Sequence, residues 1–396
     1  MGSFEIYDAN EYISKTALEE TSIKLWPPKT LSVAMYGEGQ TRGKVSIIMK
    51  EMATNQACCN IVVNEGKADY RYVYYWLKSN YHALRAISSG VRRNLNSDDI
   101  KNFPINLPKL SSQKQIGSVL YVIDKKIELN NKINAELEAM AKTIYEYWFL
   151  QFDFPNEEGK PYRSSGGKMV WNEQLKREIP DGWEVKPILE WIKSDKRGDW
   201  GKDSIEGNYQ LEVLCIRGTD LNGLNGKGEL NAPTRYILKK NAEKLLESHD
   251  LIVEISGGSP TQSTGRLGLV TEKTLERFST PIICSNFCKA FALKEKKLLF
   301  NFVYQWNNLY ECGVLFGWEG KTSGIKNLLY ENFVSGYKMP FPPSELVSRF
   351  YDYAKSIHDK IQKTLIENQE LVQIRDWLLP MLMNGQVTVE ERAAGN

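Results

Sequence analysis

The chain has little histidine and cysteine, two side chains that often bind metal ions or carry out catalysis. It contains only three histidines among 396 residues, and they do not cluster. None of its six cysteines belongs to a Cys-x-x-Cys pair. Free buried thiols in a reducing compartment are therefore a better interpretation than a metal site or a disulfide framework. We expect this chain to hold no metal and no cofactor of its own.

Long apolar runs and targeting segments are also missing. No stretch approaches the roughly 18 apolar residues that a membrane helix needs. The first ten residues have neither the basic start nor the apolar core of a signal peptide, so we expect a cytoplasmic protein. The net charge of +2 neither requires nor excludes a nucleic-acid partner, because a basic face can be balanced by acidic residues elsewhere.

Catalytic motifs are missing as well. The sequence has no Gly-x-x-x-x-Gly-Lys-[Ser/Thr] phosphate loop and no Gly-x-Ser-x-Gly nucleophile turn. Asp181, Glu184 and Lys186 resemble a metal-nuclease set, but they lie too close together in the sequence to come from two strands. The sequence therefore does not favour an enzyme.

What the sequence does contain is a long internal repeat with a spacing of 234 residues. Ser89-Gly-Val-Arg92 matches Ser323-Gly-Ile-Lys326, and the same offset carries Glu136-Leu137 onto Glu370-Leu371. This spacing is too long for a solenoid, whose repeats span roughly 20–50 residues. It indicates two copies of one domain in tandem. A duplication without a duplicated catalytic cluster is typical of a protein that recognises something twofold or bipartite.

Each copy ends in a segment whose apolar residues alternate at spacings of four and three. The first segment has no glycine or proline after Gly117 and predicts a helix of about 35 residues. The second segment predicts a similar helix, which Pro380 should kink or end. The seam residues of the two helices are Ile116, Leu120, Ile123, Ile127, Asn134, Leu137, Ile357, Ile361, Asn368 and Leu371.

Neither helix can bury its apolar stripe alone. The two most simply pack against each other as a coiled coil, and an antiparallel pair is favoured because a globular domain separates them in the sequence. Asn134 and Asn368 occupy equivalent positions in the repeat. We interpret them as polar residues that fix the register; the alternative is that both are solvated.

The front part of each copy is predicted to be an α/β (α+β) globular domain. Alternation and β-branched residues indicate strands at 45–48, 60–63, 251–255 and 267–270. Aromatic residues at helical spacing predict core helices at 70–84 and 299–309. The predicted domains are a first front domain over 1–103, a long helix over 104–155, a linker over 156–182, a second front domain over 183–337, a second long helix over 338–386 and a tail over 387–396.

The two front domains are not equal in length. Glu11-Tyr-Ile13 matches Arg235-Tyr-Ile237, and nothing before Tyr12 corresponds to residues 183–228. We therefore expect the first front domain to be short at its N-terminal side.

Two polar loops recur in both copies, and in one of them Ser89–Asn94 matches Lys321–Asn327. Gly37–Lys44 matches Ser256–Arg266, each following a predicted strand and ending in glycine plus a cation. Such residues can approach phosphates closely or bind base edges, although any one loop could be only a solvated turn. Arg92, Arg93 and Lys326 are expected to act mainly on phosphates. The candidate DNA-binding residues are Gln40, Thr41, Arg42, Lys44, Asn55, Gln56, Arg92, Arg93, Asn94, Gln262, Ser263, Thr264, Arg266, Lys321, Lys326 and Asn327.

Together these motifs resemble the DNA-specificity subunit of type I restriction–modification enzymes. The likeness covers nearly the whole chain and includes the repeated Ser-Gly-[Val/Ile]-[Arg/Lys] motif. It also includes Gly39-Gln-Thr-Arg-Gly-Lys44, Phe152-Asp-Phe-Pro-Asn-Glu-Glu-Gly-Lys-Pro-Tyr162, Ile179-Pro-Asp-Gly-Trp183 and Met381-Leu-Met-Asn-Gly-Gln-Val387.

The resemblance implies two target-recognition domains separated by two antiparallel helices that act as a ruler. Each domain would read one half of a split site in double-stranded DNA. The implied partners are two methyltransferase subunits, which would bind S-adenosylmethionine, and restriction/translocase subunits. The chain itself would be non-catalytic.

Two other classes of function stay open from the residues. One is a coiled-coil scaffold or adaptor that does not read DNA sequence. The other is an enzyme in its own right, but Trp26-Pro-Pro-Lys29 and Phe341-Pro-Pro-Ser344 do not match the Asn/Asp-Pro-Pro-Tyr/Phe motif of adenine methyltransferases.

Overall fold

The structure is a computed structural model that describes residues 4–37, 39–87, 94–257, 259, 261–322 and 325–389; the side chains of Lys321 and Thr322 are not described. The chain forms two compact units. The first contains residues 1–129 and 368–396, and the second contains residues 130–367. The mixture of helix and sheet that we predicted is confirmed.

The first unit is built on a four-stranded sheet with the order β1-β3-β2-β4. Its strands are β1 (Glu5–Ile6), β2 (Thr30–Ala34), β3 (Val45–Ile48) and β4 (Cys58–Ile61). Strand β2 lies between β3 and β4 and is antiparallel to both. Its helices are α1 (Lys15–Glu20), α2 (Tyr70–Ser79), α3 (Tyr81–Ala86) and α4 (Ser97–Lys101). Tyr72 and Tyr75 of α2 are buried in one core with Leu31 and Ile47 of the sheet.

The second unit repeats this arrangement. Its strands are β5 (Met169–Asn172), β6 (Arg177–Pro180), β7 (Glu184–Pro187), β8 (Ile192–Arg197), β9 (Tyr209–Ile216), β10 (Thr234–Leu238), β11 (Asp250–Glu254), β12 (Ser256–Gly257), β13 (Leu267–Leu269), β14 (Ile282–Cys284), β15 (Cys288–Leu293), β16 (Glu319–Thr322), β17 (Ile325–Leu328) and β18 (Lys338–Phe341). Strand β11 lies between β13 and β15 and is antiparallel to both, as β2 is to β3 and β4. Strand β8 extends this sheet beyond β15.

The aromatic helix also recurs. The α-helices of the second unit outside the long pair are α6 (Leu221–Leu224), α7 (Glu272–Leu275), α8 (Leu299–Glu311) and α9 (Tyr330–Gly336). Its 3-10 helices are η2 (Ile188–Trp191), η3 (Gly218–Asp220), η4 (Lys239–Lys244), η5 (Lys296–Leu298) and η6 (Val314–Trp318). Phe302 of α8 packs edge-on against Phe291 of β15, with ring centroids 5.7 Å apart. Helix α8 therefore covers its sheet as α2 covers the sheet of the first unit.

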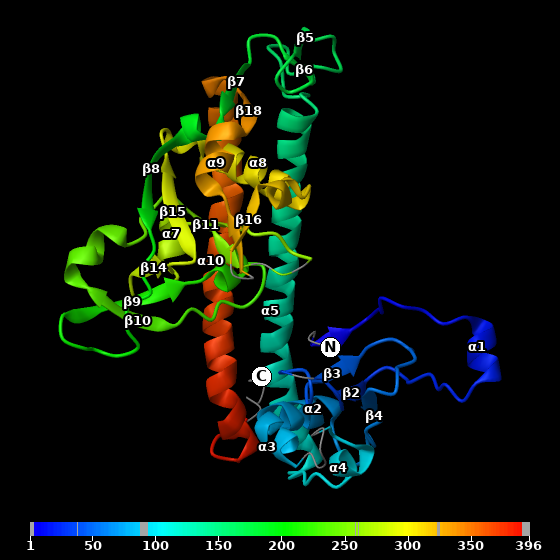
Figure 1. Ribbon diagram of the computed structural model, residues 1–396. Helices are drawn as coiled ribbons and strands as arrows, with labels where there is room; N and C mark the ends of the chain where they lie inside the picture. The colour runs from blue at the N-terminus through cyan, green and yellow to red at the C-terminus, as the bar shows by residue number, and fades with distance from the viewer. Residues whose placement is uncertain are drawn as a thin grey trace, which may run out of the picture. The chain divides into compact units, whose positions relative to one another are not determined.

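Two long helices contribute residues to both units. They are α5 (Leu110–Tyr145, 36 residues), which continues as the π-helical turn η1 (Glu146–Leu150), and α10 (Ser344–Met383, 40 residues). In the second unit, Asn130 donates to Glu367 at 2.8 Å, and the rings of Tyr145 and Phe350 lie 5.9 Å apart. Residue numbers rise along one helix as they fall along the other, so the pair is antiparallel there (Figure 1).

Three details differ from the sequence-based expectations. The strand expected at 60–63 is β4 at Cys58–Ile61, because its pairing with β2 ends at Ile61. The helix expected over 70–84 is interrupted at Asn80, which caps both α2 and α3. Pro380 does not end α10, which continues to Met383 because Leu382 and Met383 are buried in the core of the first unit.

The predicted seam positions are buried to different degrees. Ile116, Leu120, Asn134, Ile357, Ile361 and Asn368 are buried, whereas Ile123, Ile127, Leu137 and Leu371 are half-buried. Among the described residues, neither polar atom of the Asn134 amide has a hydrogen-bond partner. Its role in fixing the register stays a prediction.

Asp124 is the polar centre of the first unit. Its carboxylate lies 2.7 Å from Arg375 Nη1 and 3.3 Å from Lys78 Nζ, and it accepts a 2.8 Å hydrogen bond from the Tyr75 hydroxyl. Only 5% of the Asp124 side chain and 15% of the Arg375 side chain are exposed. Burial, followed by the charge of Asp124, raises the pKa of Tyr75. The carboxylate thus joins α5, α10 and α2.

Replacing Asp124 with alanine should lower the free energy of unfolding by about 3 kcal/mol, because two largely buried cations lose their carboxylate. Urea denaturation measures this loss. The control is Glu158→Ala, which removes an ion pair with Lys160 whose two side chains are mostly exposed, and should cost less than about 0.5 kcal/mol. Equal losses in the two variants would contradict the role assigned to Asp124.

Candidate nucleic-acid interface

In the first unit, three polar segments meet at one end of β2. Met35 follows this strand directly; its N–H donates to the Ala57 carbonyl at 2.8 Å, and its carbonyl accepts from the Leu95 N–H at 3.0 Å. The predicted site residues lie close in sequence to these three hydrogen-bonded residues. They are Gln40, Thr41, Arg42 and Lys44 in the loop after Met35, Asn55 and Gln56 before Ala57, and Asn94 before Leu95. Two backbone bonds therefore gather candidates from three parts of the sequence.

The second unit uses the same pair of backbone bonds. Ile255 follows β11; its N–H donates to the Phe287 carbonyl at 2.9 Å, and its carbonyl accepts from the Leu328 N–H at 2.8 Å. These bonds bring the 256–266 loop, the turn before β15 and the end of β17 together. Lys326 and Asn327 lie on β17, where their backbones pair with Gly257 and Ser256.

The repeated glycine–cation pair has a structural cause. In the first unit, Gly43 N–H donates to the Ala34 carbonyl at 2.8 Å, and Ala34 N–H donates to the Lys44 carbonyl at 2.9 Å. Gly43 has a φ of 84°, a left-handed conformation that glycine adopts readily. The pair therefore closes the loop between β2 and β3.

The same closure occurs between β11 and β13. Gly265 N–H donates to the Glu254 carbonyl at 2.9 Å, and Glu254 N–H donates to the Arg266 carbonyl at 3.0 Å. Gly265 has a φ of 101°, and a Cβ there would lie 2.1 Å from Leu315 Cδ2. The recurrence of glycine plus a cation is thus explained by backbone geometry.

The side chain of Arg266 is engaged inside the protein. Its Nε and Nη2 donate to the two carboxylate oxygens of Glu254 at 2.9 and 2.6 Å, and only 3% of the Glu254 side chain is exposed. These hydrogen bonds raise the pKa of Arg266. The residue at the equivalent position in the first unit is Ala34, so Lys44 has no carboxylate facing it from β2.

A second acid, Glu319, whose side chain is 9% exposed, holds the other side of this loop. Glu319 accepts from the Thr264 N–H at 2.8 Å and from its hydroxyl at 3.2 Å, and its other oxygen lies 3.2 Å from Lys326 Nζ. Lys326 also lies over the Phe316 ring, 4.9 Å from the centroid. Ser263 and Thr264 are buried. These residues form the base of the loop, and contact with DNA stays a prediction for them.

The candidates differ in exposure. Gln40, Thr41, Asn55, Gln56 and Gln262 are exposed, and Arg42, Lys44, Asn94, Arg266, Lys326 and Asn327 are half-buried. Arg92 and Arg93 lie outside the described residues, as does the side chain of Lys321, whose backbone pairs with Lys326. The exposed side chains are mostly uncharged amides, which present one hydrogen-bond donor group and one acceptor.

Asn286 and Phe287 belong to this surface but were missed from the sequence. Asn286 is exposed, and Phe287 is 56% exposed. The Phe287 carbonyl makes the same bond as that of Ala57, so Asn286 is the structural equivalent of Gln56. The sequence contained a signal for this equivalence. Residues 72–76 of one aromatic helix match residues 302–306 of the other with an offset of 230 rather than 234, and an offset of 230 carries Gln56 onto Asn286.

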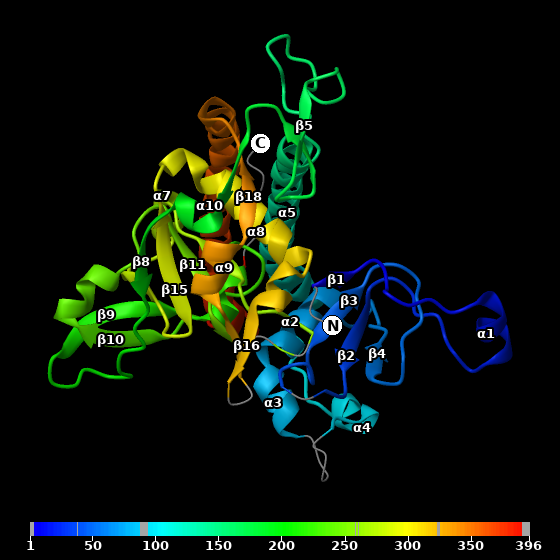
Figure 2. The ribbon, with the colours of Figure 1, turned by 45° about the horizontal axis from the view of Figure 1, so that its top comes forward.

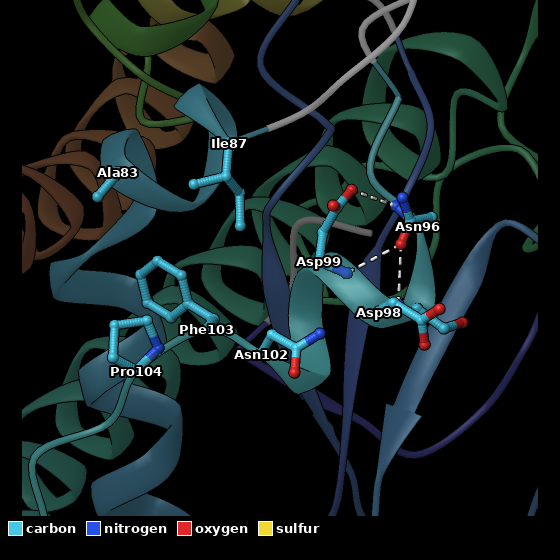
Figure 3. Close-up of a pocket in the computed structure, with 9 residues that line it drawn as sticks. Ala83, Ile87, Asn96, Asp98, Asp99, Asn102, Phe103 and Pro104 are labelled. Atoms are coloured by element: carbon cyan, nitrogen blue, oxygen red, sulfur yellow. Dashed lines mark hydrogen bonds between the residues drawn. The ribbon is translucent and has the colours of Figure 1, made fainter.

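A hollow in the first unit, beside the polar segments, does not suit a phosphate. It encloses about 620 Å³ between α3 and α4 and is lined by residues that include Ile87, Phe103, Asp98 and Asp99 (Figure 3). Asn96 and Asp99 form a capping box at the start of α4, with bonds of 2.9 and 2.8 Å. Two carboxylates at this wall repel an anionic backbone, so we leave the hollow outside the candidate interface.

Other kinds of site were also sought within the described ranges. They contain no group of three or more His, Cys, Asp and Glu side chains that could hold a metal ion. They also contain no helix with the length and apolar character needed to cross a membrane.

The chain is similar in sequence to known DNA-specificity proteins. Residues 2–139 match the family described as type I restriction modification DNA specificity domain. The chain is 26% identical over 392 residues to the type I restriction enzyme MjaIX specificity subunit of Methanocaldococcus jannaschii, with 96% of this chain and 82% of that protein covered. It is 23% identical over 344 residues to the HindI specificity subunit of Haemophilus influenzae, with 76% and 72% covered.

The fold also resembles a solved structure. The crystal structure of the type I restriction–modification system S subunit from M. genitalium matches with a TM-score of 0.56 and 17% sequence identity. The match covers 99% of this chain and 90% of that one.

The different environments of the two cations can be tested. Arg266→Ala should lower the free energy of unfolding by about 3 kcal/mol, because it leaves Glu254 buried without a cation. Lys44→Ala should cost less than about 0.5 kcal/mol, because Lys44 faces Ala34. Thermal and urea unfolding of both variants measure the difference, and a stable Arg266→Ala protein would show that the ion pair with Glu254 is not structural.

Proposed function

We propose that the chain is a specificity subunit of a type I restriction–modification system, which reads a split site in double-stranded DNA and assembles the enzyme complex around it. One observation carries this proposal: the backbone bonds of Met35 and Ile255 recur in the two units and support different side chains. Recognition of two different half-sites requires two domains that share a backbone arrangement but differ in their exposed side chains.

The exposed side chains suit base recognition. We place Gln40, Asn55 and Gln56 on one reading surface, and Gln262 and Asn286 on the other. Asn and Gln pair in bidentate fashion with adenine in the major groove, which carries the sequence information. Phe287 adds an apolar contact of the kind that recognises the thymine methyl group. Lys44 and Lys326 supply contacts to phosphate, which position the protein without reading sequence.

We further propose that α5 and α10 form an antiparallel coiled coil joining two target-recognition domains. The antiparallel contacts within the second unit support this arrangement. Helix α5 has 36 residues and is roughly 50 Å long at 1.5 Å per residue, more than the 34–36 Å of one DNA turn. In this proposal the helix length sets the unspecified spacer between the half-sites.

The proposed complex contains methyltransferase and restriction subunits in the cytoplasm, with S-adenosylmethionine bound by the methyltransferase. The chain itself performs recognition and assembly. Apolar residues exposed on the helices support a docking role: Ile374 and Trp377 on α10, and Val122 and Leu129 on α5, all in the first unit. Solvent-facing tryptophan is unusual on a helix that has no partner.

Sequence reading is tested on the chain with its methyltransferase subunit and a library of split-site DNA. Asn55→Ala with Gln56→Ala should change the preferred bases in one half-site only, and Gln262→Ala with Asn286→Ala those in the other. Each lost bidentate contact should reduce discrimination by about 1–3 kcal/mol. Selection followed by sequencing gives the preferences.

The matched control is Gln174→Ala, an exposed amide on the turn between β5 and β6, which should leave both preferences unchanged. If the unaltered complex selected no split site, the chain would be a scaffold or adaptor that does not read DNA. If both double variants altered the same half-site, the assignment of one reader to each unit would be wrong.

Docking of the methyltransferase is tested at Trp377, which is 61% exposed. Trp377→Ala should weaken assembly by at least about 2 kcal/mol, the loss expected for a central tryptophan in an interface. Isothermal titration calorimetry of the two subunits measures it. Val62→Ala, an exposed apolar residue after β4, serves as the control, and equal affinity of both variants would place the docking surface elsewhere.

A further inference from the structure

In the first unit, a tyrosine hydroxyl holds the backbone of the loop that carries Gln40. The Tyr81 hydroxyl donates to the Gln40 carbonyl at 2.7 Å. Tyr81 is the first residue of α3, which follows α2 with only Asn80 between the two helices (Figure 2). Within the described residues, no backbone N–H donates to this carbonyl. The hydroxyl thus supplies a bond that the strands do not provide to the loop.

The second unit contains the same kind of bond. The Tyr310 hydroxyl, on α8, donates to the Ser263 carbonyl at 3.3 Å. Ser263 directly follows the exposed Gln262. In the described part of this unit too, the carbonyl accepts from no backbone N–H. In each unit a tyrosine therefore ties the loop to a helix at, or next to, an exposed glutamine.

The two bonds occupy corresponding places in the repeat. The offset of 230 that relates the aromatic helices carries Asn80 onto Tyr310, so Tyr81 lies one residue beyond the equivalent position. On the loop side, Gln40 lies three residues before the glycine that closes its loop, and Ser263 lies two residues before the corresponding glycine. The tyrosine bond is therefore a shared feature of the two units, although the loops differ in sequence.

A second side chain, one helical turn away, strengthens each support. On α3, Arg85 Nη1 donates to the Tyr81 hydroxyl, and the guanidinium carbon lies 5.3 Å from the centre of the Tyr81 ring. On α8, Trp306 Nε1 donates to the carbonyl of Gly265, the loop-closing glycine, at 2.8 Å. Each tyrosine is thus part of a wider contact between helix and loop.

We propose that Tyr81 and Tyr310 are positioning residues that fix the two loops for base recognition. This inference rests on the function proposed above for the loops. A bidentate bond between a side-chain amide and adenine requires both atoms of the amide in place, and a site on a loop is less precise than one on a helix. Tying the loop backbone to a helix limits the orientations that Gln40 and Gln262 can adopt.

Loss of either hydroxyl should act on discrimination between bases rather than on overall affinity. In a loosened loop the glutamine gains less from the matching base and loses less with a wrong one. Contacts to phosphate come from other side chains and carry no sequence information, so they should persist. A tyrosine that touched the DNA backbone itself would have the opposite effect, an equal loss of affinity on every sequence.

The test uses the full chain with its methyltransferase subunit and the library of split-site DNA. Tyr81→Phe removes only the hydroxyl and should lower discrimination roughly threefold to tenfold, the effect of one hydrogen bond, in the half-site assigned to the first unit. Tyr310→Phe should have the same effect in the half-site assigned to the second unit. Affinity for unrelated duplex DNA should be unchanged in both variants.

Two other tyrosines provide matched controls. Tyr12→Phe removes an exposed hydrogen bond to Asp8 of 2.9 Å in the first unit, and Tyr236→Phe removes one to Glu212 of 3.4 Å in the second. Both controls should keep the preferences of the unaltered complex.

Hydrogen–deuterium exchange of the free chain measures the loops without DNA. Exchange should quicken at residues 39–42 in Tyr81→Phe and at residues 262–264 in Tyr310→Phe, because each loop has lost a tie to its helix. The unfolding temperature should match that of the control variants. A larger drop would show a general structural role and would count against positioning.

Unchanged preferences in both phenylalanine variants would overturn the inference, provided that the unaltered complex selects a split site. An equal loss on all sequences, unaltered exchange of the loops, or the same change in the controls would also overturn it. If the unaltered complex selected no split site, the proposed function itself would fail. The two failures are therefore distinguishable.

Discussion

The candidate interface depends on one backbone constraint, the pair of hydrogen bonds made by Met35 and by Ile255. Each residue follows a strand that is antiparallel to both of its neighbours, and it leaves a donor and an acceptor at the end of that strand. Buried backbone groups of this kind require partners, and here they find them in two segments distant in sequence. The loops are therefore held together by backbone N–H and carbonyl groups. Every residue except proline carries both groups, so this arrangement does not depend on the side chains of the loops.

This separation of backbone and side chain lets the two units diverge. In the second unit the loop is secured by Glu254 and Glu319. In the first, the Tyr81 hydroxyl donates to the Gln40 carbonyl at 2.7 Å. The cations of the second loop are partly neutralised, while exposed amides remain available in both units. In the proposed function, a surface of this composition would discriminate by hydrogen-bond geometry more than by charge.

Much of the fold could be predicted because it follows from local sequence. The long helices have uninterrupted periodicity, and α8 and β3 begin at the expected residues. The predicted ends of strands and helices are wrong where contacts with residues distant in sequence set those ends. Strand β4 ends where its pairing with β2 ends, and Pro380 is tolerated in α10 because the core of the first unit holds the last turn. Local propensity contains no information on either contact.

The sequence by itself determined that two copies of one domain carry two polar loops and two long helices, because a repeat and a helical period are properties of residue order. Only the tertiary structure decided which loop residues face solvent. Lys44 and Arg266 are equivalent in sequence, yet Arg266 binds Glu254, 12 residues away across the strand pair, while Lys44 faces Ala34. Asn286 joins the surface only through the backbone bond of its neighbour Phe287. Exposure and pairing are set by contacts between segments, which residue order alone does not specify.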